Sequence, residues 1–395
     1  MMAQLKVAIV SESFGYTSGV GVVIRMLVKF FLAMGAKVLL IGPAHLPSTR
    51  EDWKGCETLW LESKVIGNRG YRRTAIVSPK NNSLILEALR GVNLVFCESV
   101  STLVLRVMIL HSKKFLEGRV VFHAHTMADR YLWAWYGPLL GALLNLAIVK
   151  PITQFCLKVA DARLAPSQFF ADYLARTQQC KKSILPWPAP VEIPLDLPDP
   201  KETEVGRLVL QFKKEHKVVF IANGRVCEEK RSGQLIRLVL RMRRLGCDVG
   251  LVFVGGGDLN SYRNGIFPCD RKHFLFTGVL VRDLGIAINA LCDIGIALAV
   301  TDTQSLSFLE QMAMGLAMIA PDNTVMGGYV QACNCGKAIS KRTIAGMASE
   351  LKAFVRRSED FDEYGRRAQS HVANNFSEAG QIEELKHLVE GLLTK

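Results

Sequence analysis

Short apolar runs alternate with helical stretches from the start of the chain. Residues 6–11 (KVAIVS) predict a buried strand, residues 22–34 repeat apolar positions with the period of a helix, and residues 37–42 predict the next strand. Parallel strands joined by a crossover helix make a βαβ unit, the building block of α/β folds. The hydrophobic pattern therefore predicts an α/β fold.

The same alternation fills the chain in two series. Further strands are predicted at 92–96, 119–122, 161–164, 217–222, 249–254, 274–278, 292–300 and 317–321. Between the two series, six prolines within residues 186–200 cannot continue a helix and indicate a linker. Since 395 residues suit two domains, we predict two doubly wound, Rossmann-like domains facing a cleft, over residues 1–187 and 188–370.

Composition places the chain among globular proteins, with 49% hydrophobic and 22% charged residues. The ten cysteines are scattered and include only one C-x-C pair, Cys333 and Cys335, so we expect reduced thiols in a reducing compartment. The first residues run directly into a strand pattern without a signal peptide. These features predict a cytoplasmic rather than a secreted protein.

The net charge of +13 is concentrated in the first half. Residues 1–187 contain 23 Lys and Arg against 11 Asp and Glu, whereas the remainder is nearly balanced. A basic half suits an acidic partner, either nucleic acid or an anionic membrane surface, although charge can also serve solubility alone. We expect no nucleic acid, because aromatic residues are not interleaved with Lys and Arg at strand spacing.

Residues 131–149 form a stretch without a charge, interrupted by Gly137-Pro138. Its length just reaches a bilayer span, but it lies inside the βαβ series. Three interpretations remain open: a spanning helix, a buried pair of helices, or a segment at the membrane interface. The last is supported by aromatic side chains that suit the headgroup zone, namely Tyr131, Trp133, Trp135 and Tyr136.

Two groups of candidate residues belong to the first half. The loop at 13–21 follows the first strand, and Gly19 and Gly21 could let backbone amides approach a phosphate or sugar, or could be plain turn glycines. His123 and His125 follow the strand at 119–122 and point to one face. They suit acid–base work or a hydrogen bond to a sugar hydroxyl. No third metal ligand is visible, and ordinary loop histidines are the alternative.

The second half ends its strands in glycine and charged residues. Arg225 and Lys230 follow the strand at 217–222, and they could hold a diphosphate or form a solvated charge cluster. Asp302 precedes a predicted helix that begins near Leu306, and Glu310 lies within that helix. The polar run Thr303-Gln304-Ser305 before this helix can cap it, and free helix amides favour an anion. The alternative is a capped helix with two surface acids.

Together these motifs resemble the GT-B glycosyltransferases of retaining family 4, over nearly the whole chain. N-G-R-V-C-E-E-K at 223–230 is similar to the family's G-R-x-x-x-E-K loop, and T-D-T-Q-S-L-S-F-L-E-Q-M-A-M-G at 301–315 to its two-carboxylate signature. F-V-G-G-G at 253–257, F-T-G at 276–278 and S-G-V at 18–20 resemble its glycine turns, and F-H-A-H-T its strand-end histidine motif. The C-terminal helix, 371–395, is expected to cross back to the first domain.

The resemblance implies a hexosyltransferase that uses a nucleotide-sugar. Arg225 and Lys230 would bind the diphosphate, Glu310 the ribose, and Asp302 would lie near the transferred sugar. His123 or His125 would take the family histidine's role; the strand register allows either. The implied catalytic residues are His123, His125, Asp302 and Glu310, and the implied donor-binding residues are Gly19, Arg225, Lys230, Gly255, Gly257, Gly278, Thr303, Gln304, Ser305, Leu306 and Glu310.

The pattern is most similar to the subgroup that glycosylates diacylglycerol, which has H-T-H, an aromatic segment and A-D-x-x-x-x-P-S, much as at 123–125, 131–136 and 160–167. This implies a UDP-sugar donor, a membrane-lipid acceptor and peripheral attachment to an anionic membrane. No redox cofactor and no metal would be required. A soluble glycan acceptor and a non-catalytic nucleotide-binding descendant are the alternatives, because Asp302 replaces the family's usual Glu and Ser305 its usual Gly.

Overall fold

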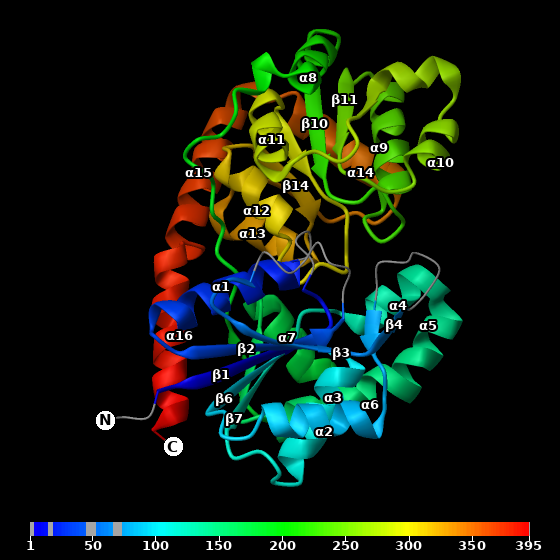
Figure 1. Ribbon diagram of the computed structural model, residues 1–395. Coiled ribbons are helices and arrows are strands. Elements are labelled where there is room, and N and C mark those ends of the chain that lie inside the picture. The colour runs from blue at the N-terminus through cyan, green and yellow to red at the C-terminus, as the bar shows by residue number, and fades with distance from the viewer. Residues whose placement is uncertain (1–3, 15–18, 45–52, 66–72, 395) are drawn as a thin grey trace. The chain divides into compact units, whose positions relative to one another are not determined.

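The computed structural model describes residues 4–14, 19–44, 53–65 and 73–394, except the side chains at 128, 131, 134 and 135 (Figure 1). The chain forms two compact units. The first contains Met1–Leu132, Pro138–Ala189 and Gln381–Lys395, and the second contains Trp133–Gly137 and Pro190–Gly380.

A parallel seven-stranded sheet forms the centre of the first unit, in the order β3-β2-β1-β6-β7-β8-β9. Its strands are β1 Lys6–Ser11, β2 Lys37–Pro43, β3 Glu57–Leu61, β6 Leu94–Glu98, β7 Arg119–His123, β8 Ala162–Ala165 and β9 Leu185–Pro186. A separate antiparallel hairpin contains β4 Ser63–Val65 and β5 Arg73–Ala75. The helices are α1 Gly19–Ala33, α2 Pro79–Ala88, α3 Thr102–Ser112, α5 Pro138–Leu144, α6 Lys150–Val159 and α7 Gln168–Thr177, and α4 Ala128–Tyr136 belongs to this unit as far as Leu132.

Central strands of this sheet are apolar on both faces, as expected where helices cover both sides. Ile9 of β1, Phe96 of β6 and Phe122 of β7 have no exposed surface. The C-terminal helix α16 (red in Figure 1) spans Glu378–Leu393, and its residues from Gln381 onward belong to the first unit. Trp187 Nε1 donates a hydrogen bond to the Gln381 carbonyl at 3.1 Å and ties this helix to the end of the sheet.

The second unit is built on a parallel six-stranded sheet in the order β12-β11-β10-β13-β14-β15. Its strands are β10 Val218–Asn223, β11 Val249–Val254, β12 Phe274–Phe276, β13 Ile294–Ile296, β14 Ala317–Pro321 and β15 Gly336–Ile339. Its helices are α8 Glu204–Lys214, α9 Ser232–Arg244, α10 Leu259–Asn264, α11 Arg282–Ala287, α12 Leu306–Ala313, α13 Val325–Cys333, α14 Ile344–Val355 and α15 Phe361–Asn375. The predicted α/β fold with two Rossmann-like domains is confirmed.

One predicted strand is much shorter than expected. The apolar run at 292–300 is a strand only at Ile294–Ile296, although Leu298 and Ala299 are also buried. Ala297 N still donates to the Ile319 carbonyl of β14 at 3.0 Å, and Ala297 and Ala299 line a pocket at the edge of the sheet. Burial therefore persists beyond the end of the strand. The apolar pattern alone cannot distinguish a buried strand from a buried loop that follows it.

The uncharged segment at 131–149 does not form a buried pair of helices, so this interpretation is wrong. The break at Gly137-Pro138 is present, but α5 continues through a π-helical turn, Asn145–Val149, into α6. The π-turn precedes Pro151, whose ring would collide with a carbonyl of a regular helix. The resulting helix, Pro138–Val159, is long and apolar enough to cross a membrane by length and composition, and only 17% of its most apolar window is buried.

Candidate functional site

The second unit has a pocket at the carboxyl ends of its central strands. Residues at the ends of β10, β11 and β13 line it together with the start of α12. Ligands of open α/β sheets bind at this edge, because loops and helix N-termini meet there. Four residues predicted from the sequence line the pocket: Arg225, Lys230, Asp302 and Ser305.

Both predicted cations of this site are held by carboxylates. Lys230 Nζ donates to the two carboxylate oxygens of Asp302 at 2.6 and 2.8 Å. Arg225 Nη2 donates to Glu229 Oε2 at 2.8 Å, and Glu229 is buried. Burial acts to lower the pKa of Lys230, but Asp302 outweighs it and holds this pKa above its ordinary value. Both cations lie at the pocket wall, where the Lys230 side chain is 26% exposed and that of Arg225 43% exposed.

The predicted glycines hold two loops together. An added Cβ at Gly255, where φ is +138°, would lie 2.1 Å from the Gly224 carbonyl oxygen, and one at Gly257 would lie 2.3 Å from that of Val226. Backbone bonds join the same loops, since Val226 N donates to the Gly256 carbonyl at 2.8 Å. Gly278 supplies the carbonyl that accepts from Gly255 N at 2.9 Å. These contacts set the path of the loop that carries Arg225.

Ser305, the last residue of the polar run before α12, departs from its predicted role as a cap. Ser305 precedes the helix with φ of +61°, in the left-handed region, and its side chain makes no capping hydrogen bond. Thr303 and Gln304 are buried, and Leu306 begins the helix. The position thus uses a backbone conformation that favours glycine rather than a side-chain cap.

Glu310 lies on α12 and forms an ion pair that the sequence analysis missed. Arg282, at the start of α11, donates from Nη2 to Glu310 Oε1 at 2.8 Å and to the Glu192 carbonyl at 2.9 Å. Burial nevertheless raises the pKa of the Glu310 carboxyl, against the lowering effect of Arg282. Arg282 follows a valine outside any motif, so only its position in the fold identifies it.

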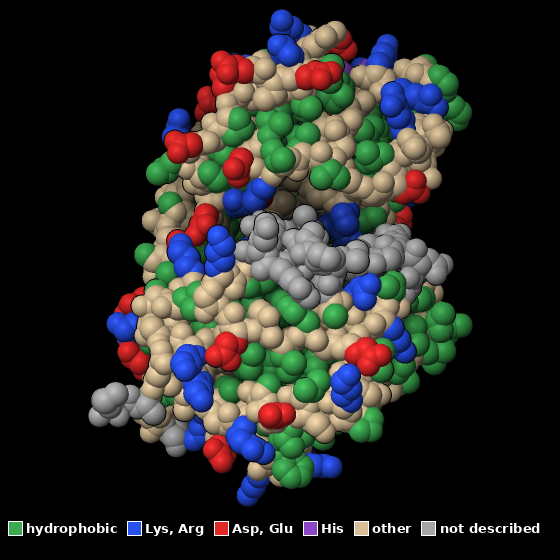
Figure 2. Space-filling view, in the orientation of Figure 1, with side chains coloured by type: hydrophobic (Ala, Val, Ile, Leu, Met, Phe, Trp, Pro, Cys, Tyr) green, Lys and Arg blue, Asp and Glu red, His purple; other side chains and the backbone are tan. Residues whose placement is uncertain are grey.

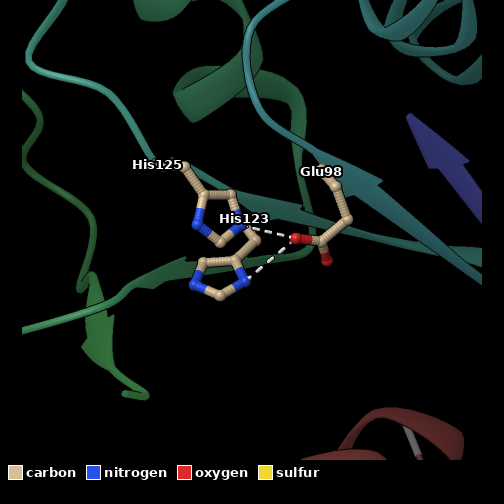
Figure 3. Close-up of side chains that lie close together, drawn as sticks. All are labelled: Glu98, His123 and His125. Carbon is tan, nitrogen blue, oxygen red and sulfur yellow. Dashed lines mark hydrogen bonds and ion pairs between the residues drawn. The ribbon is translucent and has the colours of Figure 1, made fainter. Parts of the chain in front are cut away.

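The two predicted histidines of the first unit meet at a glutamate (Figure 3). His125 Nε2 lies 2.6 Å from Glu98 Oε2, and His123 Nδ1 lies 3.2 Å from the same oxygen. Their rings lie side by side, with centroids 3.9 Å apart. Glu98 and His123 have no exposed surface, whereas the His125 side chain keeps 7%. The sequence analysis did not identify Glu98, because in the sequence it simply follows the predicted strand at 92–96 and belongs to no motif.

Burial and mutual contact shift the pKa values of Glu98 and His123. Burial acts to raise the pKa of Glu98, but the two histidines outweigh it and hold this pKa well below its ordinary value. Burial, and then the neighbouring His125, lowers the pKa of His123 to about 4. Glu98 also provides the third potential metal ligand that the sequence did not reveal, because the three side chains present ligand atoms within 4.8 Å of one another.

The remaining predicted residues fall in the first half of the chain. Gly19 is the exposed first residue of α1, and the preceding residues 15–18 of the glycine loop lie outside the described residues. On α4, Trp133 is 48% and Tyr136 56% exposed. The side chains of Tyr131 and Trp135 lie outside the described part of the chain.

The two Rossmann-like units match the fold of solved GT-B glycosyltransferases. Residues 17–193 match the model of Glycosyltransferase Family 4. The first half of the chain thus carries a glycosyltransferase family 4 domain, and the protein is a hexosyltransferase.

Solved structures of low identity share the fold over nearly the whole chain. Sucrose-phosphate synthase from Thermosynechococcus elongatus is 15% identical, with a TM-score of 0.74 over 99% of this chain and 100% of that one. HepE from Anabaena, in complex with UDP and glucose, is 13% identical, with a TM-score of 0.72 over 98% and 100%. WaaG, a glycosyltransferase involved in lipopolysaccharide biosynthesis, is 15% identical, with a TM-score of 0.65 over 98% and 100%. No curated protein sequence matches the chain.

Proposed function

We propose that the protein transfers a sugar from a UDP-sugar to a membrane lipid such as diacylglycerol, with retention at the anomeric carbon. The exposed apolar helix Pro138–Val159 carries the acceptor part of this proposal. The UDP part is supported by HepE, which has the same fold and was solved with UDP and glucose. Retention rests on the resemblance to the retaining family.

The donor side of the proposal uses the pocket of the second unit. Lys230 and Arg225 would bind the diphosphate and stabilise the negative charge that grows as UDP leaves. Their present partners, Asp302 and Glu229, keep them in place before the donor arrives. Glu310 would exchange its bond to Arg282 for bonds to the ribose hydroxyls. The C1–O bond breaks toward UDP, and the acceptor oxygen bonds to C1 on the same face. Its proton passes to the departing phosphate oxygen.

The acceptor side uses an exposed apolar face. Leu139, Leu143 and Leu146 are spaced at i, i+4 and i+7 and are 77, 57 and 60% exposed. Hydrophobic side chains gather over α5 at the right edge of the first unit in Figure 2. Each leucine fully removed from water contributes about 1.5–3 kcal/mol. Such a face on a helix, in a half with a large excess of Lys and Arg, suits insertion into the interface of an anionic membrane. Trp133 and Tyr136 on α4 are exposed nearby in the chain.

A co-sedimentation experiment tests the membrane part. Wild-type protein and the L139Q/L143Q/L146Q variant are spun with liposomes of phosphatidylcholine, phosphatidylglycerol and diacylglycerol. We expect the wild type to sediment and the variant to lose at least tenfold in partitioning. The matched control is L195Q/L208Q, which changes exposed leucines of the second unit. Equal sedimentation of all three proteins, or none by the wild type at low salt, would favour a soluble glycan acceptor.

By the same proposal the protein works in the cytoplasm as a peripheral membrane enzyme. It would require neither a redox cofactor nor a metal, since Lys and Arg supply the positive charge that the leaving diphosphate needs.

A further inference from the structure

Glu98 occupies a position at which a charged side chain is costly. It ends β6 and lies directly beside His123, the last residue of β7, in the register of the parallel pair. Its side chain has no exposed surface. An ionised carboxylate at such a place needs partners of its own, and the two histidine rings are the partners that the fold provides.

The contacts of this carboxylate fix one proton. Glu98 Oε2 lies 2.6 Å from His125 Nε2, the distance of a strong, charge-assisted hydrogen bond. Since an ionised carboxylate only accepts, the hydrogen of this bond sits on Nε2 of His125. When the ring is neutral, Nδ1 is then its basic atom.

His123 and His125 differ in what they can reach. His123 is fully buried. Its ring packs against that of Trp187, with centroids 5.5 Å apart, and against that of His125. His125 follows the strand, keeps some exposure and holds the shorter bond to Glu98. His125 is therefore the ring of this pair that a ligand can approach, and His123 forms part of its support.

We propose that Glu98 is a positioning residue for the reaction, which orients the His125 ring and fixes its proton on Nε2. This rests on the proposed function in one respect: His125 would contact the substrate of the sugar transfer, the role that the family resemblance implies for His123 or His125. The other titratable group beside Glu98 among the described residues is Cys97, and burial raises the pKa of its thiol well above the ordinary value, so it stays neutral.

The same three side chains could suggest a metal site instead, but the distances disfavour it. Ligands held at about 2.0–2.1 Å from a tetrahedral zinc ion lie more than about 3 Å from one another. The 2.6 Å between Glu98 Oε2 and His125 Nε2 is shorter. A direct hydrogen bond accounts for this pair without an ion.

Glu98→Gln tests the proposal, because glutamine keeps the shape and removes the charge. Two-dimensional ¹⁵N NMR of the ligand-free protein reports the histidine tautomers. We expect the Nε2–H form at His125 in the wild type and a mixed or Nδ1–H form in E98Q. Among the kinetic constants, kcat should fall on the order of 10- to 100-fold, by analogy with the carboxylates that orient metal-binding histidines. KM for the donor should change less than about threefold, and the pH profile of kcat should shift.

Asp161→Asn is the matched control. Asp161 accepts from Val120 N at 2.8 Å and lies 3.1 Å from His111 Nε2, so it is a second carboxylate–histidine pair, near the start of β7 rather than its end. D161N should leave the His125 tautomer and the pH profile unchanged, even where it lowers stability.

Two results would overturn the proposal. One is a wild-type tautomer and pH profile in E98Q. The other is one equivalent of bound metal in the purified wild type that E98Q lacks, which would make Glu98 a ligand. Because the NMR measurement needs no substrate, it decides the role of Glu98 even if no lipid product is found.

Discussion

Ser305 shows how a single residue can mark a departure from a family pattern. The family that this sequence resembles usually has glycine at this position. The structure explains that preference, since φ at Ser305 is +61°. A residue with a Cβ is strained in this region by about 1 kcal/mol or more. The chain thus keeps a backbone conformation that favours glycine, although the residue at this position is serine.

We therefore expect Ser305→Gly to stabilise the protein by about 0.5–1 kcal/mol, because the relief of strain exceeds the added freedom of the unfolded chain. Urea unfolding of the second unit measures this. The control is Ser307→Gly, two residues later in α12, where φ is helical and glycine should cost about 0.5–1 kcal/mol. The interpretation is wrong if both substitutions lower stability equally.

His123 makes stability depend on pH. Its pKa of about 4 lies below its ordinary value of 6.5, because the ring is buried. Between these values the unfolded chain binds a proton that the folded chain does not, so stability falls as pH falls from 6.5 toward 4. The contribution of Glu98 has the same sign, since its pKa is also held below its ordinary value, and its part of the stability is lost as pH falls below the unfolded pKa of the carboxyl group.

Urea unfolding at pH 7 and pH 5 should accordingly show a loss of roughly 2 kcal/mol attributable to His123. His123→Asn should remove this part of the difference. His273, a buried histidine of the second unit with a pKa also lowered to about 4, should retain its own part. An unchanged pH difference in His123→Asn would show that this ring is not held neutral.

At the scale of elements, the shape of the donor pocket depends on loops rather than on strands. The hydrophobic pattern predicted the strands because buried parallel strands are apolar on both faces. It could not predict β3, which begins with the exposed Glu57 and Thr58, or β15, in which the half-buried Lys337 interrupts the apolar run. It also could not show that Gly255 and Gly257 press against the loop at 224–226, since this contact depends on two strands that neighbour each other in space.

Gly255→Ala tests the importance of that contact. The new methyl group would overlap the Gly224 carbonyl, and the backbone φ of +138° is unsuitable for alanine. We expect a loss of at least about 2 kcal/mol in stability, with weaker UDP binding measured by calorimetry. Gly278→Ala is the matched control: its φ is also positive, but nothing lies within 4 Å of the added Cβ, so about 1 kcal/mol is expected. Similar losses for both variants would contradict the close-contact argument.

For the whole molecule, the sequence predicted the two-domain fold and the residue types at the strand ends. It did not predict their pairing. Arg282, Glu229 and Glu98 became visible only as partners of Glu310, Arg225 and His125. The sequence also left three interpretations of residues 131–149 open. The composition of an apolar helix is the same whether the helix is buried or exposed. The structure decides between these cases through the exposure of Leu139 and Leu143.

The central claim is sugar transfer from a nucleotide-sugar bound by the second unit to a membrane lipid. Its most direct test is mass-spectrometric detection of glycolipid after incubation of the protein with a panel of UDP- and GDP-sugars and liposomes containing diacylglycerol. We expect glycolipid from one UDP-sugar, reduced at least 100-fold by Lys230→Ala and Glu310→Gln. Lys337→Ala, which removes a surface ion pair with Glu350, should leave it unchanged. Turnover confined to soluble acceptors, or glycolipid formation that persists in Lys230→Ala, would contradict the account.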